Sequence, residues 1–335
     1  MKGKIKVGVI GVGFFGRKHA RIYNQLPEAE LVAVSDINEK RAKKIGNRLN
    51  CQYYTDYQQL LALDLDAVDI VVPDDLHREV TLQALETEKD IMLEKPLAVT
   101  KKDCEALFNA AREANNKFMI GHILRFDPRS RQAKNKITKG EIGEIVHVTS
   151  RRNSPISGAR HYAGHCELAT HSGVHDFDLV RWLVDSEYKS VYAKGRQVKL
   201  TRENIDMYDS ILSLFTFENG VIYQAENSWI LPENYPTELE AKLQIVGTEG
   251  VLKIEILNQG LEICNEEKHF YPDVQHWPEI EGEIEGYIHK EVQSFIHCVK
   301  YDKPVPVTVE DGYHSALSAI NVLNSIDKDS EISFA

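Results

Sequence analysis

Two histidines four residues apart, His171 and His175, stand in the segment Cys166–Leu183, just before an amphipathic run. Residues at this spacing share one face of a helix, so the two imidazoles can act together. An imidazole can accept a proton near neutral pH, ligate a metal ion or pack against its neighbours. The pair therefore indicates proton transfer, metal binding or ordinary packing, and the rest of the sequence must separate these alternatives.

A glycine-rich turn near the start of the chain offers a second chemistry. The pattern GxGxxG follows an apolar strand pattern and precedes a helical one. In such a turn the first glycine permits a tight turn, the second lets the backbone approach a pyrophosphate, and the third lets the helix pack against the strand. The diphosphate would rest on the positive end of the helix dipole. The residues predicted to bind a dinucleotide here are Gly11, Val12, Gly13, Phe14, Phe15 and Gly16.

An acidic residue ends the next predicted strand, twenty residues after Gly16. The carboxylate of Asp36 can accept hydrogen bonds from both ribose hydroxyls of a dinucleotide. Ile37 follows it, and no arginine stands there to bind a 2′-phosphate. We therefore expect a nicotinamide dinucleotide, with NAD favoured over NADP.

The elements that must hold this turn alternate regularly over residues 1–121. Short apolar runs rich in β-branched residues are separated by stretches with helical periodicity. Strands that are buried on both faces and separated by helices indicate a doubly wound parallel sheet. We predict an α/β fold with an N-terminal Rossmann domain that binds NAD(P) over these residues.

The pattern changes in residues 122–335. Alternating strands joined by tight turns dominate, and Asn219-Gly220 is a typical hairpin turn. We predict an α+β domain for substrate binding, with a large, mostly antiparallel open sheet and a C-terminal helix at 310–326 that is a candidate to pack back on the first domain. Such a sheet must cover its outer face, so a homodimer or homotetramer formed through it is expected.

Composition excludes several classes of partner. The net charge of −11 argues against nucleic-acid and membrane-surface binders, which need a basic face. No apolar run approaches the ~20 residues that span a bilayer. The five cysteines are scattered and form no CxxC pair, which is typical of reduced thiols in a cytosolic protein. We expect a cytoplasmic protein with a small-molecule ligand.

A charged tripeptide, Glu94-Lys95-Pro96, ends a later strand of the first domain. Ligands of open α/β sheets bind outside the carboxyl ends of the strands, which places Lys95 near a bound nicotinamide. A surface lysine at a strand end is the alternative interpretation.

Motifs along the whole chain carry a family resemblance. They are GVGFFG, PDDLH (Pro73–His77), EKP, GHILRFDPR (Gly121–Arg129), HxxDxxxWL (His175–Leu183) and IVGTEG (Ile245–Gly250). With these motifs the chain resembles the glucose-fructose oxidoreductase / inositol dehydrogenase / MocA (Gfo/Idh/MocA) family. The resemblance implies hydride transfer between a nicotinamide cofactor and a secondary alcohol of a cyclitol, sugar or sugar nucleotide.

The resemblance also implies roles for individual residues. In such proteins the EKP lysine and the HxxD histidine sit beside the reacting carbinol, and by position these are Lys95 and His175. We assign Lys95 to hydrogen-bond the alcohol oxygen and His175 to act as general base, since an ordinary histidine pKa of about 6.5 lies near operating pH. Many relatives carry aspartate where this chain has His171. Either Lys95 and His175 carry the proton alone, or His171 relays it.

Further contacts are predicted on both sides of the domain boundary. Guanidinium groups bind carboxylates and phosphates in a bidentate fork, so arginines there could hold an anionic part of the substrate, such as a sugar-nucleotide diphosphate. Solvated charges and ion pairs are the alternative. The predicted substrate contacts are Lys95, Arg125, Arg152, Asn153, His171 and His175. The predicted cofactor contacts beyond the glycine loop, Asp36 and Ile37 are Val72, Pro73, His77, Glu94 and Lys95.

The histidine segment also contains enough soft donors for zinc. They are His161, His165, Cys166, His171 and His175. We expect no metal there, because enzymes of the family work with a nicotinamide cofactor and a lysine.

Two other functions stay open at this point. A dinucleotide-binding fold can act as a non-catalytic sensor that controls a partner, since fold does not dictate function. A glycosidase or lyase that uses transient oxidation by bound NAD is the other alternative, and slow net cofactor reduction alongside product formation would reveal it.

Overall fold

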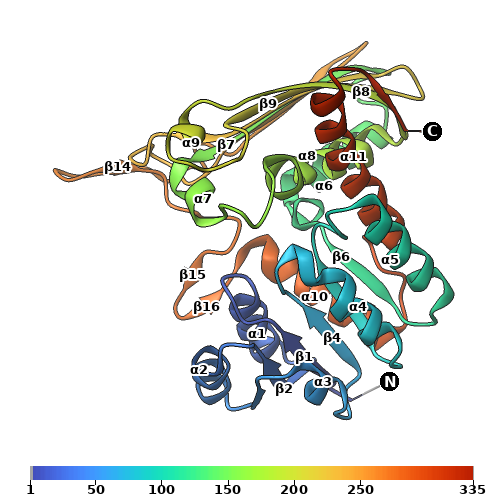
Figure 1. The fold of residues 1–335 in the computed structure, drawn as a ribbon, viewed down its shortest axis with the longest axis vertical. Coiled ribbons are helices and arrows are strands. Elements are labelled where there is room, and N and C mark those ends of the chain that lie inside the picture. The colour runs from blue at the N-terminus through green and yellow to red at the C-terminus, as the bar shows by residue number, and fades with distance from the viewer. Residues whose placement is uncertain (1–2, 335) are drawn as a thin grey trace. The chain divides into compact units, whose positions relative to one another are not determined.

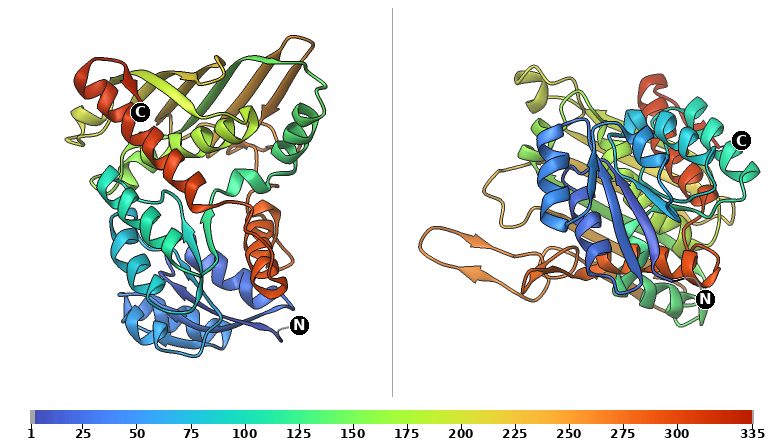
Figure 2. Two further views of the ribbon diagram at one scale, coloured as in Figure 1. Left: turned by 90° about the vertical axis from the view of Figure 1, so that its right-hand side faces the viewer. Right: turned by 90° about the horizontal axis from the view of Figure 1, so that it is seen from below.

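A computed structural model of the protein describes residues 3–334. The chain folds into two compact units, shown in Figures 1 and 2. The first unit comprises the chain up to Phe126 together with Gln275–Tyr313, and the second comprises Asp127–Val274 together with the chain from His314 onward. A segment from late in the sequence is therefore part of the N-terminal unit.

The first unit contains a six-stranded sheet in the order β3-β2-β1-β4-β5-β6, and all of its pairings are parallel. This is the strand order of the Rossmann fold, and it confirms the predicted doubly wound sheet. The order reverses between β1 and β4, where ligands of such sheets bind. The strands are β1 (Ile5–Ile10), β2 (Ala29–Ser35), β3 (Gln52–Tyr54), β4 (Ala67–Ile70), β5 (Asp90–Glu94) and β6 (Phe118–Gly121).

Helices connect these strands and cover the sheet (Figure 1). Asn38 and Thr100 cap two of them, each through a side chain that accepts a backbone N–H. Helix α10 packs against α1, and its buried residues include Val292 and Phe295. The helices are α1 (Gly16–Gln25), α2 (Glu39–Leu49), α3 (Tyr57–Leu61), α4 (His77–Leu85), α5 (Lys101–Glu113) and α10 (Gly286–Tyr301), with short 3-10 turns at Asp74–Leu76 and Ile123–Phe126.

The second unit contains a seven-stranded sheet in the order β12-β11-β7-β10-β9-β8-β17. All pairings are antiparallel except that of β7 with β10, which confirms the predicted mostly antiparallel sheet. Gly220 makes the turn of the β9–β10 hairpin with φ of +86°. The strands are β7 (Ile145–Pro155), β8 (Tyr188–Arg196), β9 (Ser210–Phe217), β10 (Ile222–Leu231), β11 (Glu240–Gly247), β12 (Val251–Glu255) and β17 (Ile332–Ser333).

Helices of the second unit lie along one face of this sheet (Figure 2). Phe177 of α8 packs there against Phe215 of β9, with ring centroids 5.0 Å apart. Within residues 3–334 the other face of the sheet has no helix on it. The helices are α6 (Pro128–Thr138), α7 (Ile156–His161), α8 (Val174–Val184), α9 (Lys199–Arg202) and α11 (Val309–Lys328), whose first residues belong to the first unit.

Two small hairpins complete the fold. They pair β13 (Ile263–Cys264) with β14 (His269–Phe270), and β15 (Glu279–Ile280) with β16 (Glu283–Ile284). None of the helices in residues 3–334 combines the length and the apolar character that a membrane crossing requires.

Candidate active site

The glycine-rich loop joins β1 to α1, and its three glycines differ in how much space surrounds them. Gly11 has φ of +86°, and a Cβ there would lie 2.4 Å from the carbonyl oxygen of Val71. A Cβ on Gly16 would lie 1.8 Å from the carbonyl oxygen of Gly11, so α1 can begin this close to β1 only with glycine. Around Gly13 the nearest atom to an added Cβ is Nη1 of Arg41, at 3.8 Å. This open backbone fits a diphosphate.

Asp36 lies at the end of β2 and is 7% exposed. Its Oδ2 accepts a hydrogen bond from the backbone N–H of Val12 at 3.1 Å, and its Oδ1 accepts one from the N–H of Asn38 at 2.9 Å. Arg41, in the first turn of α2, also donates to Oδ2, at 3.1 Å. Sequence reasoning looked for an arginine only next to Asp36, where Ile37 is 89% exposed, and missed Arg41. The signal available in the sequence was the predicted helix after Asp36, because the first turn of that helix brings Arg41 back toward the Asp36 carboxylate.

An aromatic cluster flanks the loop. Phe14, 46% exposed, and Phe15 meet the ring of Trp277 edge to face, at centroid distances of 6.3 and 5.3 Å. The ammonium of Lys18 lies 4.0 Å from the ring centre of Phe14. Trp277 stands more than 260 residues later in the chain, so no local sequence signal could have linked it to this loop.

Lys95 follows β5 directly, at the carboxyl end of the parallel sheet where it was predicted. Its backbone N–H donates to Oε2 of Glu94 at 3.1 Å. The neighbouring strand provides space for the Glu94 side chain by carrying glycine at position 121, since a Cβ on Gly121 would lie 3.1 Å from Cδ of Glu94. Glu94 on β5 and Gly121 on β6 together set the position of the carboxylate next to Lys95.

His77 begins α4 and is fully buried. Its Nδ1 lies 2.7 Å from the carbonyl oxygen of Pro96, and its Nε2 lies 3.1 Å from that of Val72. Burial is the main cause that lowers the pKa of His77, so the ring is neutral at pH 7. The ring connects the loop after β4, where Val72 is half-buried and Pro73 exposed, to the loop after β5. A direct contact of these three residues with the cofactor stays a prediction.

The two histidines of the second unit do not share one regular α-helix. His171 lies in a π-helical turn at Ala169–Gly173, and His175 lies in the first turn of α8. Both are half-buried, and the ring centroid of His171 is 4.2 Å from that of Tyr162. Single π-helical turns are frequent at functional sites. The pair thus stands on an irregular segment that the spacing alone did not reveal.

Arg152 and Asp176 form a buried bidentate ion pair between β7 and α8. Nε of Arg152 donates to Oδ2 at 2.9 Å, and Nη2 donates to Oδ1 at 2.8 Å. Arg152 is 5% exposed and Asp176 is 4% exposed. The guanidinium fork therefore binds a carboxylate of the protein, and the substrate contact assigned to Arg152 stays a prediction.

Buried amide atoms without a protein partner lie near this pair. Asn153 donates through Nδ2 to Glu226 at 2.8 Å, whereas its buried Oδ1 has no hydrogen-bond partner among residues 3–334. Asn227 of β10, in register with Arg152, has a buried Nδ2 without one. Such groups can bind the hydroxyls of a ligand. Sequence reasoning missed Asn227, although a polar residue at an inward position of an alternating strand was the available signal.

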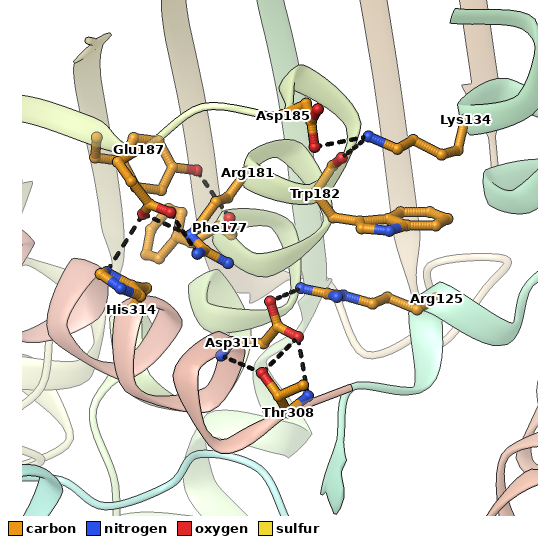
Figure 3. Close-up of polar contacts among 11 residues, drawn as sticks. Arg125, Lys134, Phe177, Arg181, Trp182, Asp185, Glu187, Thr308, Asp311 and His314 are labelled. Atoms are coloured by element: carbon orange, nitrogen blue, oxygen red, sulfur yellow. Dashed lines mark hydrogen bonds and ion pairs between the residues drawn. The ribbon is translucent and has the colours of Figure 1, made fainter. Parts of the chain in front are cut away.

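Arg125 is also paired within its own unit (Figure 3). Its Nη2 lies 2.9 Å from Oδ1 of Asp311, and Oδ2 of the same carboxylate accepts the backbone N–H of Thr308 at 2.9 Å. Arg125 is 7% exposed. This contact joins the 3-10 turn at Ile123–Phe126 to the start of α11, and the predicted role of Arg125 in substrate binding stays a prediction.

The soft donors of the histidine segment do not converge. Among residues 3–334, the run from His161 to His175 brings no three donor atoms within 4.8 Å of one another, whereas His19, Glu94 and Glu291 do so elsewhere.

Comparison with known proteins identifies the family. The model described as an oxidoreductase family with an NAD-binding Rossmann fold matches residues 5–122, and the model for the C-terminal alpha/beta domain of that family matches residues 134–334. The chain belongs to the Gfo/Idh/MocA oxidoreductase family. The resemblance predicted from the motifs is thereby confirmed.

Individual relatives agree with this assignment. The inositol 2-dehydrogenase/D-chiro-inositol 3-dehydrogenase of Lacticaseibacillus casei is 31% identical over 333 residues, covering 98% of this chain and 93% of the relative. The scyllo-inositol 2-dehydrogenase (NAD(+)) of Bacillus subtilis (strain 168) is 27% identical, covering 97% and 95%. A crystal structure of scyllo-inositol dehydrogenase from Lactobacillus casei with bound cofactor NAD(H) and scyllo-inositol shares the fold, with a TM-score of 0.87, 24% identity and coverage of 98% and 99%. The Gfo/Idh/MocA chain is thus an NAD-dependent oxidoreductase that acts on CH–OH groups.

Proposed function

We propose that this protein oxidises a secondary hydroxyl group of a cyclitol with NAD+. The observation that carries the proposal is the match with an inositol 2-dehydrogenase over 98% of the chain. The sensor and transient-oxidation alternatives have no comparable support. The proposal assigns proton handling to Lys95 of the EKP motif and His175 of the HxxD motif, following the motif resemblance.

The residues of the chain divide the reaction between them. Bound NAD+ accepts the hydride, while the protein orients the alcohol and takes its proton. Lys95 hydrogen-bonds the alcohol oxygen and stabilises the alkoxide that develops there. His175 accepts the hydroxyl proton as general base. His171, packed against Tyr162, supports His175 by relaying the proton or holding its surroundings.

A neutral polyol fits better than a sugar nucleotide. Both buried arginines proposed as anion contacts are held by carboxylates of the protein, Arg125 by Asp311 and Arg152 by Asp176. The partly unpaired amides of Asn153 and Asn227 are suited to hydroxyl groups instead. We therefore place the substrate among inositols.

A cofactor-reduction screen tests this proposal. We expect NADH formation with at least one of scyllo-, myo- and D-chiro-inositol, in a one-to-one ratio with ketone product. Aldoses and UDP-sugars at equal concentration serve as comparisons. A UDP-sugar with the highest kcat/KM would contradict the choice of a neutral cyclitol, and product without net NADH would favour transient oxidation.

We further propose a homo-oligomer formed through the open sheet of the second unit. Leu212, Leu214 and Ile222 are about half exposed on its strands, and such an apolar surface is typical of an interface. Leu212→Glu combined with Leu214→Glu should give a monomer in analytical ultracentrifugation. A monomeric wild type would contradict the proposal.

A cytoplasmic location is the last part of the proposal. Within residues 3–334 none of the five cysteines forms a disulfide, which suits a reducing compartment. Recovery of the native protein in the soluble cytoplasmic fraction of its source cells would support it, and recovery outside would contradict it.

A further inference from the structure

Four ionisable side chains meet in the interior of the first unit. They come from α1, β4, β5 and α10, and we call them the buried cluster: His19, Asp69, Glu94 and Glu291. Nδ1 of His19 lies 2.8 Å from Oδ2 of Asp69, and its Nε2 lies 3.4 Å from Oε1 of Glu94. Three of the four are fully buried, and the side chain of Glu94 is 14% exposed. The imidazole of His19 therefore lies between two carboxyl groups.

The carboxyl group of Glu291 makes no hydrogen bond to any residue in the range 3–334. Both of its oxygens are buried, and one lies within 4.8 Å of a nitrogen of His19 and an oxygen of Glu94. An ionised carboxylate in such a place carries a large desolvation penalty that nothing offsets. Burial, followed by the charges of Glu94 and Asp69, raises the pKa of Glu291 well above its usual value. The geometry and the electrostatics both favour a neutral carboxyl group.

The charges of the other three members of the buried cluster and of Lys95 balance one another. Burial opposes the charged ring of His19, but the carboxylates of Asp69 and Glu94 outweigh it and raise the pKa of His19. The Nδ1–H of an imidazolium can donate to Asp69, whereas Nε2 lies 3.4 Å from Glu94, at ion-pair distance and without a hydrogen bond among residues 3–334. Burial raises the pKa of Glu94, while the charges of His19 and Lys95 oppose that shift. With His19 charged and Glu291 neutral, Asp69 balances His19, and Glu94 is left to balance Lys95. Neighbouring groups do not change this, since Tyr23 stays a phenol with a raised pKa, mainly through burial, and Lys18 lies over the exposed ring of Phe14.

We propose that Glu291 is a protonated positioning residue, and that it acts with the His19–Asp69 pair to keep a single negative charge on Glu94 beside Lys95. The proposal rests on the function proposed above, in which Lys95 acts as an ammonium group. A carboxylate next to Lys95 favours the charged form of the lysine. An ionised Glu291 would push a proton onto Glu94 by like-charge repulsion and remove that support. Glu291 thus acts through Glu94 and touches neither substrate nor cofactor.

The first test compares Glu291→Gln with Glu291→Ala. The amide has the shape of a neutral carboxyl group, so Glu291→Gln should retain kcat within about twofold, whereas Glu291→Ala should lose about tenfold. Glu113→Gln, the same change at an exposed position of α5, is the control. Loss of about tenfold in kcat by Glu291→Gln would overturn the proposal.

The pH dependence of unfolding gives a readout that does not need activity. A glutamate with a raised pKa in the folded state binds a proton that the unfolded chain releases, so it lowers stability as pH rises above the ordinary value of 4.5. Glu291→Gln lacks this loss and should melt at a higher temperature than the wild type at pH 8, with the difference vanishing toward pH 4.5. A variant that melts lower at pH 8 would overturn the proposal. So would a divalent metal retained one per chain, because it would make Glu291 an ionised ligand.

The second test removes the charge on the imidazole. In His19→Gln the largely buried Glu94 should take up a proton, so the ammonium of Lys95 loses the negative charge beside it. The alkaline limb of the kcat/KM profile should move down by about one pH unit, with NAD+ affinity within about threefold. Profiles that superimpose on that of the wild type would overturn the proposal. Wild-type inactivity on every alcohol would instead contradict the proposed function and leave the unfolding result to decide on Glu291.

Discussion

The glycine loop of the first unit and the histidine segment of the second, which we propose to be catalytic, are built by different physical means. The loop works through backbone, because Gly11 and Gly16 fit where any side chain would overlap a carbonyl oxygen. The histidine segment works through side chains, and a buried ion pair between Arg152 and Asp176 holds it to the sheet. The first region should therefore respond to added volume and the second to lost charge.

This difference also separates binding from chemistry. The loop offers backbone N–H groups and space to a diphosphate, and none of its side chains carries a proton in the reaction. Lys95 and His175, which we propose to handle the proton, stand outside the loop. A variant of the loop should thus lose cofactor affinity, whereas a variant at Lys95 or His175 should lose turnover with the cofactor still bound.

The largest effect is expected from Lys95→Ala. Removing the ammonium leaves the developing alkoxide without its nearest positive charge, so kcat should fall by about 10³-fold. NAD+ affinity should stay within about threefold. Lys101→Ala, an exposed lysine in the first turn of α5, is the control. Full turnover in Lys95→Ala, measured by NADH absorbance, would show that chemistry does not depend on this residue.

Gly16→Ala should mainly affect the fold. A Cβ 1.8 Å from the carbonyl oxygen of Gly11 cannot be accommodated without moving α1 away from β1, and we expect a loss of roughly 4 kcal/mol in unfolding free energy. Gly158→Ala, in α7 with its nearest neighbour 3.9 Å away, is the matched control. Urea unfolding measures both, and equal midpoints for the two variants would refute the steric role of Gly16.

Arg152→Met tests the region that depends on charge. It leaves Asp176 buried without its partner, so the unfolding free energy should fall by about 3 kcal/mol. Arg152→Met combined with Asp176→Leu should recover most of that loss, since no buried charge remains. If the stable double variant had a strongly raised KM for the substrate, Arg152 would bind substrate in addition to its structural role.

The smallest effect concerns His77, which connects the two loops of the first unit. Its lowered pKa means that the unfolded chain takes up a proton below pH 6.5 that the folded chain does not. The stability that the neutral ring contributes is present above that pH and is lost as pH falls, by about 1 kcal/mol. His77→Gln should show a flatter decline in melting temperature from pH 7 to 5, and His165→Gln, at an exposed position, should not. Identical slopes for the three proteins would refute this.

The sequence predicted much of the first unit, because the evidence there was local. The glycine spacing, Asp36 at the end of a strand and Lys95 at the end of another all follow from rules that need no tertiary contact. What it missed depends on distant segments: Trp277 packs beside Phe14, and α10 supplies Glu291 to the buried cluster. No periodicity or motif reports such contacts.

For the second unit too, the sequence could not show the backbone geometry and the distant contacts on which the candidate site residues depend. Spacing indicated that His171 and His175 could share a helical face, but the π-helical turn changes the geometry between them. The arginines were read as possible anion contacts because their carboxylate partners lie far along the chain, at Asp176 and Asp311. Ion pairs between distant residues cannot be read from composition or local pattern.

Calorimetric titration of NAD+ into the cofactor-free protein and into Gly13→Ala tests the central claim most directly. Position 13 has room for a methyl group in the folded protein, with the nearest atom 3.8 Å away, so the variant should unfold at the same urea concentration as the wild type. We predict one NAD+ bound per chain in the wild type and an affinity at least about tenfold weaker in Gly13→Ala, because the methyl group would occupy the space of the diphosphate. Equal affinities, or no binding by the wild type, would contradict the account.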